Sequence, residues 1–291
     1  MSVSVKLLGG LGNQMFQYAA ARALADRAAS ELLLDVGEFA HYTLRRYELD
    51  AMRVRARIQQ PPSAAVAPGP IARGARALRQ RFFPRQAPQA PLYRERSFNF
   101  DPGLLQQGAP VQLEGYWQSE KYFRDAADAI RRDFTLADNL DAANRAMLQH
   151  MQGTIAVSVH VRRGDYVTNP TTAAYHGTCS PEYYRQAVEH IARRCGPLTL
   201  FVFSDDQQWV RANLPFAHPT VHVDCNPPER GAWDMHLMKQ CRHHVIANSS
   251  FSWWGAWLDP SADKIVVAPR RWFTDPGIDT SDLVPAGWVR I

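Results

Sequence analysis

The chain has 291 residues, of which 46% are hydrophobic and 21% are charged, and its formal net charge is +5. This composition can bury a sizeable core and excludes a largely disordered protein, while the length allows two domains of about 150 residues each. The positive charge does not indicate nucleic-acid binding, because it is concentrated in one segment instead of being spread over the chain.

The N-terminal stretch lacks the features of an export signal. MSVSVKLLGGLGNQ has neither the apolar core of a signal peptide nor a small-residue cleavage site. No apolar run in the sequence reaches the ~18 residues of a membrane-spanning helix. Four cysteines (Cys179, Cys195, Cys225, Cys241) are too widely spaced for metal knuckles and too few for a disulfide scaffold. We therefore expect a cytoplasmic protein with free thiols.

Short apolar runs alternate with helical patterns along most of the chain. In chain order we expect strands at 3–8, 31–35, 111–113, 155–159, 198–203, 221–224, 244–247 and 264–268, and helices at 12–27, 120–134, 140–151, 181–194, 207–214, 231–241 and 251–258. Apolar strands that alternate with helices predict parallel sheets covered on both faces. The expected fold class is therefore α/β.

A basic segment at about residues 53–96 interrupts this alternation. Between Arg45 and Arg96 the chain has twelve arginines against three acidic residues, a net charge of +9, so that the remainder carries −4. Proline and alanine are frequent there, which disfavours regular strands and permits at most a short helix near residues 71–83. The segment is either a solvated loop or a patch attracted to an anionic membrane surface, peripherally at the inner membrane, or to an acidic glycan.

In parallel α/β folds, ligands bind beyond the carboxyl ends of the strands, so the polar clusters that follow the strands are the candidate site. The first cluster is GGLGNQ, residues 9–14. It has Gly10 and Gly12 but Met15 where a dinucleotide fingerprint needs its third glycine, and it lacks the GK[ST] of a phosphate-binding loop. We expect a glycine turn leading into a helix whose N-terminus accepts an anion or a sugar hydroxyl, with Asn13 and Gln14 as hydrogen-bonding amides.

A second cluster, NSSFSWW, follows the strand expected at 244–247. Asn248, Ser249 and Ser250 stand where a helix begins, just before Phe251. The unpaired N–H groups of that helix, its dipole and the small hydroxyls converge on one place. This is the outline of a phosphate site. The alternative is simple N-capping by one of the serines, with the aromatic residues as ordinary core.

A third cluster, HVRRGDY at residues 160–166, comes straight after the buried strand expected at 155–159. Guanidinium groups donate paired hydrogen bonds to phosphate oxygens, and alternation along a strand turns neighbouring side chains to opposite faces. If His160 and Arg162 face the ligand, Arg163 points away and pairs with a structural carboxylate such as Asp165. Arg162 is therefore the expected phosphate ligand.

The fourth cluster is Ser204, Asp205 and Asp206, after the strand expected at 198–203. Two adjacent aspartates are typical of a ribose or base contact plus a helix cap, and no DxD motif with further metal ligands stands out. Two helix N-termini and an arginine around one crevice indicate a diphosphate, and hence a nucleotide-linked ligand. We infer that arginine, without a metal, is the counter-charge to the leaving group.

Five motifs in a fixed order carry a resemblance to a known family. GGLGNQMFQYA, GYWQSEKYF, HVRRGDY, FSDD and WDMHLMKQCRHHVIANSSFSWWGAWL, between about residues 5 and 273, resemble the bacterial alpha-1,2-fucosyltransferases. The resemblance implies a GT-B architecture of two Rossmann-like domains facing a central cleft, an acceptor-side domain over residues 1–150 and a GDP-fucose-binding domain over 151–291. It also implies metal-independent transfer of L-fucose, with inversion, from GDP-fucose to the 2-hydroxyl of a terminal beta-galactose.

The resemblance also assigns residues. The family motif HxRRGDY falls without a gap on residues 160–166, and the arginine that it places at the donor diphosphate is Arg162. The SSFSWW motif falls on residues 249–254, and Asn13 belongs to the motif on the other wall of the cleft. The expected donor-binding residues are Gly10, Gly12, Asn13, Arg162, Asp165, Ser204, Asp205, Asp206, Asn248, Ser249, Ser250 and Phe251. The basic segment departs from the compact family pattern, which leaves acceptor recognition open.

A base must take the acceptor proton, unless a loose transition state postpones that transfer. Glu114, at the end of an N-terminal strand, is one candidate, with a surface ion pair as the alternative. His160 is the other, with a hydrogen-bonded structural histidine as the alternative. We expect Gln14, Tyr116 and Trp117 to contact the acceptor sugar.

Other functions stay open on sequence alone. A fucosyltransferase of another linkage, alpha-1,6 or protein O-fucosyl, would share the donor site. A sugar-nucleotide-binding protein would keep that site without turnover. An adhesion module is not expected, because the RGD tripeptide at 163–165 follows a buried strand instead of lying on an exposed loop tip.

Overall fold

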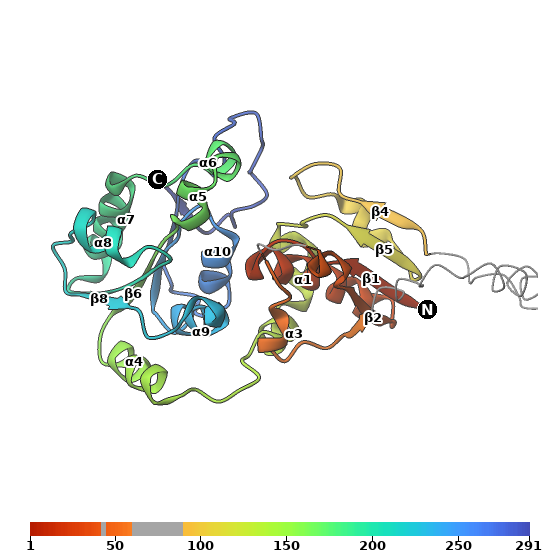
Figure 1. Cartoon of the computed structure of the whole chain (residues 1–291), viewed down its shortest axis with the longest axis horizontal. Helices are drawn as coiled ribbons and strands as arrows, with labels where there is room; N and C mark the ends of the chain where they lie inside the picture. The colour runs from red at the N-terminus through yellow and green to blue at the C-terminus, as the bar shows by residue number, and fades with distance from the viewer. Residues whose placement is uncertain (42–44, 60–89) are drawn as a thin grey trace, which may run out of the picture.

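The computed structural model describes residues 1–41, 45–59 and 90–291, which form two α/β halves side by side (Figure 1). The described strands of the first half form one parallel sheet in the order β3-β2-β1-β5-β4. They are β1 (Ser2–Lys6), β2 (Glu31–Asp35), β3 (Arg57–Gln59), β4 (Leu92–Arg94) and β5 (Val111–Glu114). β1 is the central strand, and its Val3 and Val5 are fully buried.

Helix α1 (Leu11–Arg27) follows β1 and is buried on almost every side. A helix without a polar face lies between two layers, and α1 packs on β1 and β2 while its other side meets the second half. The first half also contains α3 (Ala127–Asp133) and short 3-10 turns: η1 (Gly37–Ala40), η2 (Leu49–Ala51), η3 (Pro102–Gln106), η4 (Glu120–Tyr122) and η5 (Arg124–Ala126).

The described strands of the second half form a parallel sheet in the order β11-β10-β9-β6-β7-β8. They are β6 (Ala156–Val161), β7 (Thr199–Ser204), β8 (Thr220–Val223), β9 (His243–Val245), β10 (Val266–Ala268) and β11 (Val289–Arg290). The helices are α4 (Ala142–Gln152), α5 (Gly164–Thr168), α6 (Pro170–His176), α7 (Pro181–Cys195), α8 (Gln207–Asn213), α9 (Gly231–Met238) and α10 (Ser250–Trp257), with η6 (Pro228–Arg230). β6 is buried at every residue, as a strand covered on both faces must be.

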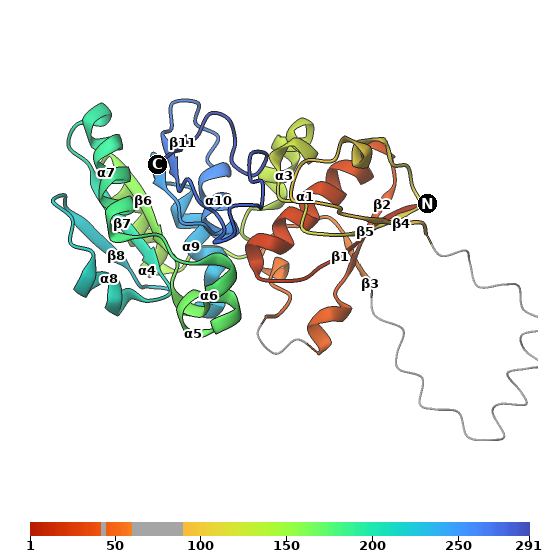
Figure 2. The same cartoon turned by 90° about the horizontal axis from the view of Figure 1, so that it is seen from above.

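The two halves meet where α1 packs against α10, and the views of Figures 1 and 2 agree on this placement. The ring of Phe16 lies 4.5 Å from that of Trp253 and 4.9 Å from that of Trp254, centroid to centroid. Trp254 Nε1 also donates to the Gly12 carbonyl at 3.0 Å. One hydrophobic cluster therefore runs from the first sheet through α1 into α10. The predicted α/β class, and the GT-B pairing of two parallel sheets around a cleft, are confirmed.

The structure corrects several predicted elements. The helix expected at 120–134 is two 3-10 turns followed by α3, and the helices α5 and α6 were not predicted. The basic segment begins and ends in strands, β3 and β4, although its composition disfavours strands. Both are edge strands. Every residue of β3 is exposed, and in β4 only Tyr93 packs against the core. The predicted short helix at 71–83 and most of the suggested membrane or glycan patch lie outside the described residues.

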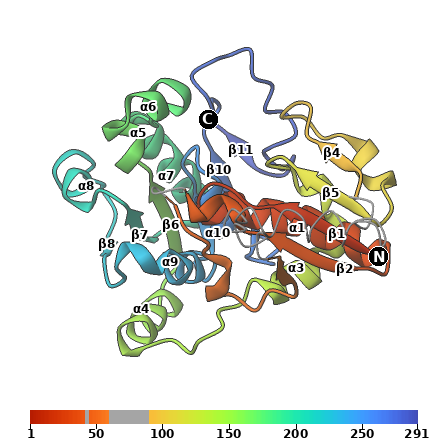
Figure 3. The same cartoon turned by 45° about the vertical axis from the view of Figure 1, so that its right-hand side comes forward.

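Helix α4, expected in the first domain, packs against α9 of the second half (Figures 1 and 3). The ring of its His150 lies 5.3 Å from that of Phe201 on β7. The four cysteines are free thiols. Among the described residues no helix is both long and apolar enough to cross a membrane.

Candidate active site

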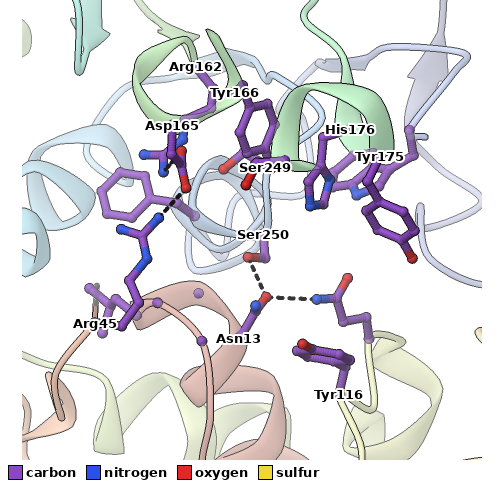
Figure 4. Close-up of a pocket in the computed structure, with 18 of the residues that line it drawn as sticks. Asn13, Arg45, Tyr116, Arg162, Asp165, Tyr166, Tyr175, His176, Ser249 and Ser250 are labelled. Carbon is purple, nitrogen blue, oxygen red and sulfur yellow. Dashed lines mark hydrogen bonds and ion pairs between the residues drawn. The ribbon is translucent and has the colours of Figure 1, made fainter. Parts of the chain in front are cut away.

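A cavity of about 430 Å³ lies between the two halves, at the carboxyl ends of their central strands. The turn after β1, the loop after β5, the segment after β6 and the start of α10 all contribute to it (Figure 4). We call the described residues around it the cavity lining: Gly9, Gly10, Leu11, Gly12, Asn13, Arg45, Glu48, Phe98, Tyr116, Gln118, Arg162, Asp165, Tyr166, Thr172, Tyr175, His176, Pro228, Gly231, Ser249, Ser250, Phe251, Trp272 and Phe273.

Arg162 belongs to the cavity lining and is held by two carboxylates. Its Nη2 donates to Asp165 Oδ1 at 2.6 Å, and its Nη1 lies 2.9 Å from Asp205 Oδ2. The guanidinium carbon also lies 5.3 Å from the centroid of the Tyr166 ring. These contacts fix the orientation of the guanidinium group, and the two carboxylates keep it charged by raising its pKa, although burial acts in the opposite direction.

Arg163 lies outside the cavity lining, as alternation at the strand end predicts. Its Nε donates to Asp206 Oδ2 at 3.1 Å, so its partner is Asp206 and not the predicted Asp165. Its guanidinium carbon stacks 3.7 Å from the ring centroid of Trp209. Asp165 instead belongs to the cavity lining and pairs with Arg162.

Ser204, Asp205 and Asp206 support the two arginines and lie outside the cavity lining formed by the described residues, so their expected role in donor binding stays a prediction. Ser204 Oγ donates to the Val161 carbonyl at 2.8 Å and accepts from the Asp206 N–H at 3.0 Å. Asp206 also caps α8 by accepting from the Trp209 N–H at 3.0 Å, so the predicted helix cap is confirmed.

The two glycine- and serine-rich helix starts meet each other. A Cβ added to Gly12 would lie 2.5 Å from the Ser250 carbonyl carbon and 2.6 Å from the Phe251 nitrogen. Only glycine therefore permits this crossing of α1 and α10. Gly10, Gly12, Asn13, Ser249, Ser250 and Phe251 all belong to the cavity lining. The positive ends of both helix dipoles thus lie beside the cavity and favour an anion there.

Asn248 is a structural residue, which corrects its expected contact with the donor. Its Nδ2 donates to the carbonyls of His176 at 2.9 Å and of Trp272 at 3.2 Å. The side chain is buried and outside the cavity lining of described residues. It joins the end of α6 to the segment before Phe273 and so positions residues that do line the cavity.

Gln14 and Trp117, two of the residues expected to contact the acceptor, lie in the core. Gln14 Nε2 donates to the carbonyls of Gly9 at 2.9 Å and Arg46 at 2.8 Å, and its Oε1 accepts from the Glu48 N–H at 3.0 Å. Trp117 is fully buried in a positive-φ turn. Tyr116, in contrast, belongs to the cavity lining.

Neither predicted base belongs to the cavity lining of described residues. Glu114 pairs with Arg94, Nε to Oε2, at 2.8 Å, which is the surface ion pair that the sequence left as the alternative. His160 is buried, and its ring lies 5.3 Å from that of Phe251. Burial, and secondarily the charge of Arg162, lower the pKa of His160 to about 3. Its Nδ1 has no hydrogen-bond partner among the described residues.

Several residues of the cavity lining were not predicted. Arg45 and Glu48 come from a loop of the first half, and Thr172, Tyr175 and His176 come from one face of α6. Others are Phe98, Gln118, Tyr166, Pro228, Gly231, Trp272 and Phe273. Gln118 and Tyr166 stand inside recognised motifs, which is the signal that could have found them. The rest stand in no recognised motif and leave no local pattern in the sequence.

His176 lies among aromatic rings at the cavity. Its ring stacks on Tyr166 with centroids 4.6 Å apart and meets Tyr175 edge-on at 4.8 Å. Burial lowers the pKa of His176 to about 4, and Arg162 adds to this shift while Asp165 opposes it. The imidazole is therefore neutral at pH 7. Its Nδ1 has no hydrogen-bond partner in the part of the chain that the structure describes.

No group of three or more His, Cys, Asp or Glu residues among those described is arranged to hold a metal ion. Among the described residues, the cations in the cavity lining are the guanidinium groups of Arg45 and Arg162.

Comparison with known proteins places this chain in a family. The model of glycosyl transferase family 11 matches residues 104–291. Over its full length, the chain is 35% identical to an alpha-1,2-colitosyltransferase of Escherichia coli, and the alignment covers 99% of that protein. It is 33% identical to the O-antigen biosynthesis glycosyltransferase WbnK of Escherichia coli, over 98% of this chain and 99% of WbnK.

More distant relatives match less closely. Human galactoside alpha-(1,2)-fucosyltransferase 1 is 28% identical over 54% of this chain and 45% of the human protein. Among solved structures, the fucosyltransferase NodZ from Bradyrhizobium aligns with a TM-score of 0.46 and 15% identity, over 87% of this chain and 91% of that one.

Proposed function

Because the chain belongs to glycosyl transferase family 11 and is a glycosyltransferase, we propose that it is an inverting alpha-1,2-fucosyltransferase. It would move L-fucose from GDP-fucose to the 2-hydroxyl of a terminal beta-galactoside in a glycan. The observation that carries this proposal is the division of the cavity lining. Arg45 and Arg162 meet around Asp165 and, with the starts of α1 and α10, form an arginine end rich in hydrogen-bond donors, whereas Tyr116 and Tyr175 lie at the other, aromatic end (Figure 4).

The arginine end fits the diphosphate of the donor. Arg162 is already oriented by Asp165 and Asp205, so it would lose little freedom when it binds a phosphate oxygen. The first N–H groups of a helix have no partner within the helix, and those of α10 begin at Ser250. When the sugar departs, negative charge builds on the diphosphate, and these donors would stabilise it.

The aromatic end fits the transferred sugar and the acceptor. Phe98, Tyr116, Tyr175, Trp272 and Phe273 present rings to the cavity, with the amide of Gln118 and the hydroxyl of Thr172 beside them. Aromatic faces pack against the apolar faces of sugar rings, while amides and hydroxyls select among sugar hydroxyls. Tyr116 comes from the first half and Tyr175 from the second, so both halves would contribute to recognition.

His176 replaces Glu114 and His160 as the proposed base. Three side chains of the cavity lining have an atom that can accept a proton from an acceptor hydroxyl: Glu48, Asp165 and His176. Asp165 is paired with two arginines, and Glu48 accepts from the Leu11 N–H at 3.1 Å. His176 is neutral at pH 7 because burial lowers its pKa to about 4. It therefore has a lone pair that can accept a proton.

The proposed transfer is a single displacement at the anomeric carbon. The acceptor 2-hydroxyl oxygen forms a bond to the anomeric carbon of fucose from the face opposite the diphosphate. The bond from that carbon to the phosphate oxygen breaks, and its electron pair stays on GDP. The hydroxyl proton passes to His176 and then to solvent. One displacement inverts the anomeric centre.

Colitose is a second candidate for the transferred sugar. The alpha-1,2-colitosyltransferase of Escherichia coli aligns with this chain over its whole length at 35% identity. Colitose is L-fucose without its 3-hydroxyl, so GDP-colitose would make the same diphosphate contacts. A site that hydrogen-bonds the 3-hydroxyl would discriminate strongly against a donor that lacks it, because the polar groups of the site would be left unpaired.

The test supplies GDP-fucose or GDP-colitose to the protein with a panel of beta-galactosides and determines the product linkage by NMR. An alpha-1,2 linkage from GDP-fucose supports the proposal, and turnover of GDP-colitose alone supports the second candidate. An alpha-1,6 linkage or transfer to a protein would replace both. Donor binding with neither transfer nor donor hydrolysis would contradict a catalytic role. A parallel assay with EDTA tests the expected metal independence, which loss of activity and its restoration by magnesium or manganese would refute.

A further inference from the structure

Arg45 reaches the cavity from the first half and ends at the same carboxylate as Arg162. Arg45 Nη2 lies 2.5 Å from Asp165 Oδ2, and Arg162 Nη2 lies 2.6 Å from Asp165 Oδ1 (Figure 4). One carboxylate therefore joins two guanidinium groups that come from opposite sides of the cleft. Arg45 and Asp165 keep about a third of their side-chain surface exposed, 32% and 33%, so a ligand in the cavity can reach them.

Arg162 alone has little positive charge to spare for a diphosphate. It pairs with Asp205 as well as Asp165, so two carboxylates share its single charge. A donor diphosphate brings one negative charge on each phosphate, and cleavage of the sugar bond adds more to the leaving group. Among the described residues of the cavity lining, Arg45 is the other arginine, and it has an ion pair with Asp165.

We propose that Arg45 is a second ligand of the donor diphosphate, contributed by the first half of the chain. This inference rests on the proposed function. Asp165 holds both guanidinium groups toward one point, and a phosphate at that point would accept hydrogen bonds from both arginines. The donor would then join the two halves through its leaving group. Both halves of the chain would then stabilise the negative charge of the diphosphate.

The neighbouring Arg46 supplies a matched control. Its Nη2 donates to the Glu229 carbonyl at 2.7 Å, so it also links the two halves. Arg46 lies outside the cavity lining of described residues. Its hydrogen bond is exposed to solvent and ends on a backbone carbonyl and not on a carboxylate. Removing Arg46 therefore tests the loss of a link between the halves without the loss of a charged side chain from the cavity lining.

The experiment measures binding of GDP and of guanosine by isothermal titration calorimetry to the wild type, Arg45→Gln, Arg45→Lys and Arg46→Gln. We expect Arg45→Gln to weaken GDP binding at least tenfold and to leave guanosine binding unchanged, because guanosine has no phosphate. Arg45→Lys should recover part of the loss, since a lysine keeps the charge but not the fork of donors. Arg46→Gln should bind both ligands like the wild type.

Four results would overturn the inference. Arg45→Gln could bind GDP as tightly as the wild type, or it could lose affinity for guanosine and GDP equally, which would make Arg45 a structural link. Arg46→Gln could weaken GDP binding as much as Arg45→Gln does. A wild-type protein that does not bind GDP at all would overturn the proposed function as well, so the two failures are distinguishable. Melting temperatures of all variants show whether each one folds.

Discussion

Ser250 Oγ donates a hydrogen bond to Asn13 Oδ1 at 2.8 Å and thereby ties the first turn of α10 to the first turn of α1. Gln118 Nε2 donates to the same Asn13 oxygen, also at 2.8 Å (Figure 4). One amide oxygen thus connects three sequence motifs, the loop after β5 included. The two helix starts beside the cavity are therefore held in a fixed relation before any ligand binds.

Two substitutions of Asn13 should separate the structural effect of these hydrogen bonds from the effect of charge on GDP binding. Asn13→Ala leaves the Ser250 hydroxyl and the Gln118 amide without their acceptor, so we expect a loss of about 1–3 kcal/mol in the free energy of unfolding. Asn13→Asp keeps an acceptor for both and should be the more stable variant. It adds a negative charge beside the proposed diphosphate, however, and should bind GDP at least about tenfold more weakly than the wild type. Urea unfolding and calorimetry check the two effects; an Asp variant that binds GDP normally contradicts the second.

Substitutions of the adjacent Arg162 and Arg163 should have different effects, one on turnover and the other on stability. Arg162→Ala removes the proposed diphosphate ligand, so transfer should fall by at least about a hundredfold, equivalent to about 3 kcal/mol of transition-state stabilisation. Arg163→Ala removes the contacts with Asp206 and Trp209 and should lower the melting temperature while turnover persists. Steady-state kinetics and thermal melting distinguish these outcomes. Loss of turnover in Arg163→Ala with an unchanged melting curve, together with an active Arg162→Ala, would reverse the assignment.

The fold was predictable to the extent that its elements carry a local pattern. Buried strands such as β6 are continuous apolar runs, and helices such as α7 have a clear apolar stripe and a Ser180 cap. β3 and β4 lack such a signal, because edge strands are specified by the neighbour with which they pair. The helix expected at 120–134 begins instead with a 3-10 turn that the Ser119 side chain caps. That cap would also suit an α-helix, and the interruption lies at Phe123, whose φ of −134° is not helical.

The candidate site was predictable at the strand ends and not elsewhere. Arg162, Asn13 and Ser250 reach the cavity because topology brings the carboxyl ends of parallel strands together. Arg45 and His176 come from a loop and from the end of a helix, whose positions depend on tertiary packing. Gln14 was wrongly assigned to the acceptor for a related reason. An amide binds ligands or backbone equally well, and only the fold shows that the carbonyls of Gly9 and Arg46 occupy it.

Two glycines of one turn should respond differently to the same substitution. Gly12→Ala places a methyl group 2.5 Å from the backbone of Ser250, so α1 and α10 must move apart. We expect a loss of about 1–3 kcal/mol in the free energy of unfolding, even though alanine favours helices. In Gly10→Ala the nearest described atom would be 3.7 Å away, on Arg45, which is an ordinary contact. Chemical denaturation of both variants tests this difference, and equal stabilities would contradict the tight crossing.

His176 should determine the acidic limb of the activity profile if it is the base. Burial lowers its pKa to about 4, so the reactive neutral form persists well below pH 7 and is lost only as the pH falls toward 4. We expect kcat/KM to stay level from about pH 7 to 5 with respect to this group, and His176→Gln to lower it about 10²–10⁴-fold.

His236 is the matched control for that experiment, because burial also lowers its pKa to about 4 and it lies outside the cavity lining of described residues. His236→Gln should retain the activity and the acidic limb of the wild type. Circular dichroism at each pH shows whether the protein remains folded. A His176→Gln enzyme with normal kcat/KM would exclude this base.

His160 should make the protein less stable in mild acid. Burial and Arg162 lower its pKa in the folded chain to about 3, whereas the unfolded chain has the ordinary value of 6.5. Between these values the unfolded state binds the proton and the folded state does not, so stability is full above pH 6.5 and falls as the pH drops toward 3. At pH 5.5, one unit below the ordinary value, the loss from this residue is about 1.4 kcal/mol.

His160→Phe removes the titrating group and keeps a ring beside Phe251. Urea unfolding at pH 7.5 and 5.5 should therefore show a drop about 1.4 kcal/mol smaller in the variant than in the wild type, whatever its absolute stability. An equal drop in both proteins would mean that His160 takes up a proton as readily in the folded chain as in the unfolded one.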